Sequence, residues 1–151
     1  MGVEELNLIE PALSGARHLK AQFPHIIFTS GARSVVDQAR AMAQNIAQDR
    51  HGYLRVYKAR AEANELQAWV DAHPAATSVA AIQAGLLSVM NAWPAARQMK
   101  LSSHLGGLAF DVQPLPDGPA ATAIKAAIRA LPHCTFLERE GKLTRWHAQF
   151  A

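Results

Sequence analysis

Apolar residues recur at helical spacing along much of the chain. From Glu4 to Lys20 they lie three or four positions apart, and Pro11 either kinks this helix or marks its start. Short β-branched and aromatic runs predict strands at 25–29 and 108–112, and a hairpin over 134–150 that turns near Gly141. Further helices are expected at 35–49, 59–72, 77–92 and 117–131, where similar stretches end at proline, glycine or a polar residue.

The order of these elements predicts an α+β fold, with helices packed on one face of a small antiparallel sheet. A chain of 151 residues is typical of one domain, so we expect a single domain spanning residues 1–151. Neither a dinucleotide-binding glycine motif nor a phosphate-binding loop occurs in the sequence.

Composition and charge exclude several classes of protein. With 50% hydrophobic and 18% charged residues the chain is not intrinsically disordered. Its net charge of +3 suits an anionic partner such as cell wall, but no Lys/Arg cluster predicts a nucleic-acid partner. No apolar run reaches the ~18 residues of a membrane span, so no membrane insertion is expected. The acidic first residues predict that there is no signal peptide.

Candidate chemistry concentrates in the segment 102–112. If 108–112 is extended, Phe110 faces the core, while Asp111 shares the opposite face with Ala109. The glycine pair before the strand allows a tight turn that brings His104 back beside Asp111. Histidine nitrogen and carboxylate oxygen are ligands that suit Zn²⁺.

The last strand offers a third ligand. Alternation over 143–150 places Trp146 on the core face and places His147 on the other face, with Arg145 and Gln149. Two histidines and one carboxylate, with an open position for water, would make a catalytic zinc site. Cys134 is either a fourth, soft ligand or a small buried hydrophobic residue.

These residues resemble a known family. Ser102, His104, Gly107, Ala109 and Asp111 match the SxHxxGxAxD motif of the zinc D-alanyl-D-alanine peptidases related to VanX, VanY and the hedgehog signalling domain. The segment 28–39 looks like the family's strand-SGxRS-helix element, and residues 146–147 look like its terminal WH motif.

The resemblance implies a hedgehog/D-Ala-D-Ala peptidase-like fold and a bound Zn²⁺ held by His104, Asp111 and His147. It also implies that Arg33 holds substrate or the transition-state oxyanion, and that Ser102 lies near substrate. A guanidinium group suits that task because it presents a planar fork of donors.

One position departs from the family's pattern. The family's general base is a glutamate three residues before the last ligand, where this chain has Thr144. A threonine hydroxyl cannot accept a proton from water at neutral pH. We expect Glu138 to serve as the general base, since an even hairpin loop places it on the face of His147, with Glu140 as the second choice.

The sequence therefore predicts a zinc peptidoglycan peptidase that cuts a peptide bond beside a D-amino acid. Because no signal peptide is expected, a phage lysin or virion-associated lysin is favoured, with phage particle components as further partners. Such a lysin would pass from the host cytoplasm to the periplasm and cell wall, or act from the virion. Two alternatives stay open: a catalytically impaired wall- or protein-binding module, and a cytoplasmic dipeptidase that acts on D-Ala-D-Ala.

Overall fold

The computed structural model describes residues 1–151, which form two compact units. The first unit comprises residues 1–32 and 106–151, and the second comprises residues 33–105. The second unit is thus inserted into the sequence of the first. That the whole chain acts as a single domain stays a prediction. None of the helices combines the length and apolar character that a membrane span requires.

The first unit is built on a four-stranded antiparallel sheet with the strand order β1-β2-β4-β3. The hairpin predicted over 134–150 is confirmed, and Gly141 at its turn has a φ of 63°, which favours glycine. The strands are β1 (Phe28–Ser30), β2 (Ala109–Val112), β3 (Cys134–Glu140) and β4 (Leu143–Phe150).

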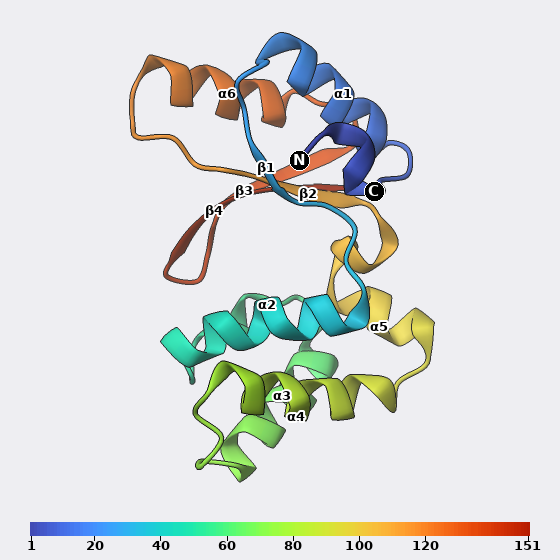
Figure 1. Ribbon diagram of the computed structural model, residues 1–151, viewed down its shortest axis with the longest axis vertical. Coiled ribbons are helices and arrows are strands. Elements are labelled where there is room, and N and C mark those ends of the chain that lie inside the picture. Colours follow the sequence, from blue (N-terminus) through green and yellow to red (C-terminus); the bar gives the residue numbers. More distant parts are fainter. The chain divides into compact units, whose positions relative to one another are not determined.

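Two helices cover one face of this sheet, as Figure 1 shows: α1 (Ala12–Gln22) and α6 (Pro119–Arg129). Of the two alternatives for Pro11, the structure confirms that it marks the start of the helix, since α1 begins at Ala12 and only a short 3₁₀ turn (Val3–Leu6) precedes it. The α+β class is confirmed. The core of this unit contains Leu19, Phe28, Phe110, Ile128, Trp146 and Phe150, among other buried residues.

The predicted alternation of faces on β2 and β4 is confirmed. Phe110, Val112, Trp146 and Ala148 are buried in the core beneath the helices. Asp111 and His147 are directly opposite each other in the β2–β4 pairing, so their side chains share the face that α1 and α6 leave uncovered. The sheet therefore presents the predicted ligands from two neighbouring strands.

A close backbone approach fixes the end of β1. A Cβ on Gly31 would lie 2.5 Å from the carbonyl oxygen of Leu6, so a larger residue could not be accommodated without movement. The amide of Ala32 donates a hydrogen bond to that carbonyl at 2.8 Å. This contact holds the chain beside Ser30, which pairs with Asp111 of β2.

The second unit is entirely helical, and the expected helices are confirmed with small shifts at their ends. Ser34 and Ser78 cap two of them, since their side chains accept hydrogen bonds from the amides of Asp37 and Ala81. A helix over 95–101 follows Pro94 and was not predicted. The helices are α2 (Val35–Gln48), α3 (Arg60–Ala72), α4 (Val79–Asn91) and α5 (Ala95–Leu101), with a 3₁₀ turn at Tyr53–Val56.

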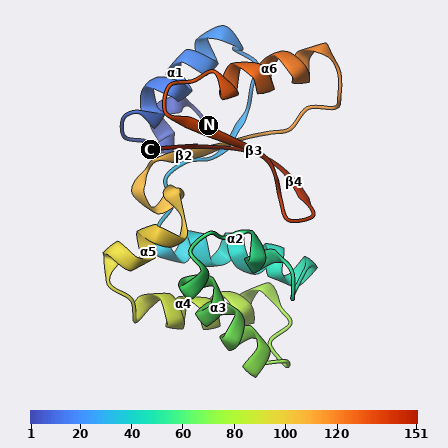
Figure 2. The same ribbon diagram turned by 180° about the vertical axis from the view of Figure 1, so that it is seen from behind.

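Helices α2, α3 and α4 pack closely within this unit (Figure 2). Gly85 of α4 lies directly against the indole of Trp69 of α3, because a Cβ there would overlap the ring at 2.0 Å. Trp93 after α4 is also buried and donates its indole N–H to Glu65. The buried apolar side chains are mainly Met42, Ile46, Leu66, Val70, Ile82, Leu86 and Met90.

Candidate metal centre

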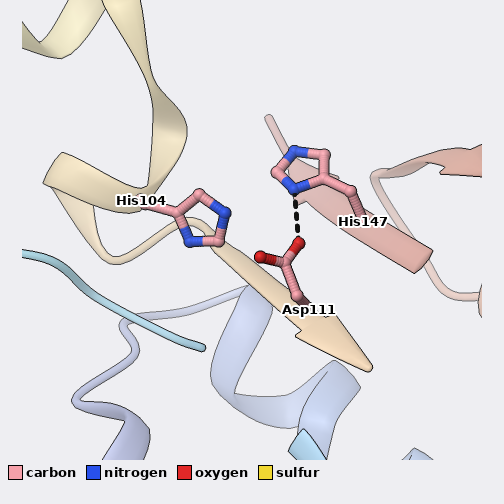
Figure 3. Close-up of side chains that lie close together, drawn as sticks. All are labelled: His104, Asp111 and His147. Carbon is pink, nitrogen blue, oxygen red and sulfur yellow. Dashed lines mark hydrogen bonds and ion pairs between the residues drawn. The ribbon is translucent and has the colours of Figure 1, made fainter. Parts of the chain in front are cut away.

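The side chains of His104, Asp111 and His147 converge (Figure 3). Each offers one ligand atom, and these atoms all lie within 4.8 Å of one another. Asp111 comes from β2 and His147 from β4, whereas His104 comes from the connection that precedes β2. The sequence placed these three residues together, and the structure brings them together.

Local backbone contacts hold His104. It lies in a 3₁₀ turn (Ser103–Gly106), and its amide donates to the hydroxyl of Ser102 at 3.2 Å. Its carbonyl accepts a hydrogen bond from the amide of Arg33 at 2.9 Å. Gly107 then adopts a φ of 73°, a conformation that favours glycine and turns the chain into β2. His104 is only 3% exposed, so its ring is held in a buried setting.

Asp111 and His147 are in direct contact. The Nδ1 atom of His147 lies 2.9 Å from Oδ1 of Asp111, and the hydroxyl of Ser30 donates to Oδ2 of the same carboxylate. Burial disfavours a charged imidazole, but the hydrogen bond and negative charge of Asp111, with the charge of Glu140, outweigh it. The pKa of His147 is therefore raised above its ordinary value.

Two further side chains contact His147. Its Nε2 atom lies 3.0 Å from Oε1 of Gln149, two residues further along β4. Oε1 of Glu140 lies 3.8 Å from its Nδ1 atom, and the Glu140 side chain is 23% exposed. The imidazole thus has a carboxylate-rich side at Nδ1 and an amide at Nε2.

The donor set fits zinc. Two imidazoles and one carboxylate are a common ligand set of catalytic zinc, which keeps a further position for water or substrate. An ion bound at about 2.0–2.2 Å holds opposed ligand atoms at most about 4.4 Å apart. Since the three ligand atoms already lie within 4.8 Å, small side-chain adjustments would bring them onto one ion.

Other residues predicted for the site have local roles that the structure makes visible. The Arg33 side chain contacts Gln38 of α2, with Nη1 3.4 Å from Oε1. Ser102 binds the amide of His104. The roles of Arg33 and Ser102 toward substrate stay predictions. Cys134 is outside the ligand group and packs at the edge of the sheet-unit core, as the alternative of a small buried hydrophobic residue anticipated.

Glu138 does not share a face with His147, which corrects the expectation from hairpin parity. The β3–β4 register shifts between Leu137 and Arg139, and Leu137 is the residue opposite His147. Glu138 instead forms ion pairs with Arg129 and with Lys125, both from α6. Hydrogen bonding to Arg129 holds the pKa of its carboxyl below the usual range. Glu140 is the hairpin carboxylate that lies beside His147.

Two residues of the centre were missed by sequence reasoning. Gln149 was placed on the face of His147, but no contact between them was inferred from the i, i+2 spacing. The sequence indicates Ser30 only as part of the SGxRS element and predicts no contact between Ser30 and Asp111. The signal for Ser30 is its position at the end of β1, next to β2, but strand order is needed to see it.

The chain was compared with protein families, with curated proteins and with solved structures. No family model matches the chain, and no curated protein or solved structure is significantly similar to it.

Proposed function

We propose that the protein is a zinc-dependent peptidase that hydrolyses a peptide bond beside a D-amino acid in peptidoglycan peptides, with the fold of the zinc D-alanyl-D-alanine peptidases. The observation that carries the proposal is the convergence of His104, Asp111 and His147. These are the residues that the motif resemblance assigns as zinc ligands. The three side chains come from separate segments of the chain, and their convergence supports a common role in binding one metal ion.

Zinc held there would act as a Lewis acid toward a peptide carbonyl and would make water nucleophilic near neutral pH. Glu140 is the chain's own candidate for moving protons in this reaction. Its carboxylate is partly exposed and lies 3.8 Å from Nδ1 of His147. In this role it accepts a proton from the attacking water and donates it to the leaving amine.

Arg33 is proposed to hold the substrate carboxylate or the developing oxyanion. Its backbone amide is bonded to the carbonyl of His104, so the residue is tied to the same segment as one ligand. Its Nη1 atom lies 3.4 Å from Oε1 of Gln38 of α2, near the upper limit of a hydrogen bond.

The decisive experiment combines metal analysis with digestion of purified peptidoglycan. We expect about one zinc per chain and release of peptide fragments. His104→Ala should lose both zinc and activity, while His25→Ala, which removes an exposed histidine, should change neither. Iron in place of zinc would contradict the proposal, since two histidines and a carboxylate also bind ferrous iron. Release of D-alanine from D-Ala-D-Ala alone would identify a dipeptidase.

A second candidate function is a binding module that retains zinc without turnover. The observation that favours it is Thr144, an exposed residue where the resembled motif has its catalytic glutamate. Zinc binding together with retention of the protein on insoluble peptidoglycan, without release of fragments, would establish this function instead.

A further inference from the structure

The two ring nitrogens of His147 have different partners. Nδ1 lies 2.9 Å from Oδ1 of Asp111, and Nε2 lies 3.0 Å from Oε1 of Gln149. Residues 147 and 149 lie two apart on one strand, so their side chains share a face. His147 is 5% exposed, and water has little access to replace either contact.

The two oxygens of Asp111 are also distinguished. Oδ2 accepts a hydrogen bond from the hydroxyl of Ser30, and Oδ1 is the oxygen directed at His147 (Figure 3). Both oxygens of Asp111 thus have a partner from a neighbouring strand, Oδ2 from β1 and Oδ1 from β4.

We propose that Gln149 is a positioning residue that selects the metal-binding nitrogen of His147, so that the cation is held through Nδ1 while Nε2–H is donated to Gln149. The inference deepens the proposed function and rests on the metal centre that it assumes.

The physical reason is the single proton of a neutral imidazole. One nitrogen carries this proton and the other carries the lone pair that binds a metal. Without a cation, Nδ1 faces the carboxylate of Asp111 and Nε2 faces the amide oxygen of Gln149. A cation shared with Asp111 would replace the proton on Nδ1, while Gln149 keeps the proton on Nε2. Coordination through Nε2 would require Gln149 to give up this contact.

The inference is tested by long-range ¹H–¹⁵N correlation spectra of the ¹⁵N-labelled protein loaded with Zn²⁺. We expect His147 to show a protonated Nε2 and a metal-bound Nδ1. Spectra in which Nε2 is metal-bound would overturn the inference, whatever the activity of the protein.

Variants at position 149 provide a second readout. Gln149→Met removes the acceptor oxygen at similar size and should weaken Zn²⁺ binding about 10–100-fold, the usual cost of losing a partner of a metal ligand. Gln149→Glu keeps an acceptor oxygen and should restore most of the affinity. Gln113→Met changes an exposed glutamine just after β2 and should leave the affinity unchanged.

The outcomes separate this inference from the proposed function. Zinc bound through Nδ1 by a protein that does not digest peptidoglycan would leave the inference standing and remove the function. Unchanged zinc affinity in Gln149→Met, with digestion intact, would overturn the inference alone. A protein that binds no zinc would overturn both.

Discussion

Position 144 carries a hydroxyl where the resembled peptidases have a carboxylate, and the carboxylate nearest to His147 comes from Glu140 instead. The two positions lie on opposite sides of the β3–β4 turn. A proton acceptor must be near the reacting water, but it need not come from a fixed place in the sequence. The proposed role of general base therefore falls to Glu140 rather than to Thr144.

Replacing Glu140 with Gln should lower peptidoglycan turnover about 10²–10⁴-fold, the typical contribution of a general base. Zinc content should be unchanged, because the three proposed ligands remain. Turnover of a fluorescent peptidoglycan substrate and metal analysis of the same preparation provide the measurements.

Glu138→Gln is the matched control, since it makes the same chemical change on the same strand. The pairing of Glu138 with Arg129 and Lys125 predicts a modest effect on stability and none on turnover. If Glu138→Gln reduced turnover while Glu140→Gln did not, Glu138 would be the general base, as the sequence predicts. If Glu140→Gln lost zinc, Glu140 would be a ligand rather than a base.

Cys134 should react slowly with iodoacetamide at pH 8. Burial outweighs a backbone hydrogen bond from Gln149 and raises the pKa of its thiol to about 11. Only the thiolate is reactive, so the rate should rise about tenfold per pH unit until the pH nears this pKa. The pKa of the thiol is thus higher in the folded chain than its unfolded value of about 9. The thiol therefore contributes to stability at pH values below about 9, and this contribution is lost as the pH rises from about 9 to about 11.

Mass spectrometry of labelled protein at several pH values measures the rate. Rapid and complete labelling at pH 8 would show that the thiol is not buried against the core. It would also reopen the alternative that Cys134 is a reactive or metal-binding residue.

At the scale of elements, the packing of α3 on α4 depends on Gly85. In an isolated helix, Gly→Ala would stabilise by about 1 kcal/mol. Here the added methyl group overlaps the Trp69 indole, which is stacked on His73 at 4.2 Å. Overpacking typically costs about 1–3 kcal/mol, so Gly85→Ala should lower the free energy of unfolding in urea titration.

A second substitution tests the cause of that loss. Trp69→Phe removes the ring atoms that the new methyl group meets, so Gly85→Ala should cost less in the Trp69→Phe background than in the natural chain. Equal costs in the two backgrounds would show that the indole is not the obstacle.

Periodicity predicted most elements because each has one buried face whose spacing reveals its type. The helix Ala95–Leu101 was missed for a physical reason: it is only seven residues long, and Leu101 is its single buried residue. The position of Glu138 was missed because parity arguments assume a regular ladder, and the β3–β4 register is irregular at this point. The residue types of the hairpin do not predict this shift in register.

At the scale of the whole molecule, the sequence predicted the α+β class and the convergence of three side chains, but not the division into two units. The reason lies in what a local pattern can report. Strand alternation reveals which residues share a face, as for Asp111 and His147. It does not reveal that residues 33–105, which connect β1 to β2 in the sequence, form a compact unit of their own.

The strand order has a consequence for the way this molecule folds. β4 is the last strand in the sequence, yet it lies between β2 and β3. Until β4 docks, β2 has only the short strand β1 beside it. The same event buries Trp146 and brings His147 to Asp111. Docking of β4 therefore closes the sheet and brings two of the three candidate ligands together in the same event. A cation bound by this pair would favour the closed sheet over its open precursor.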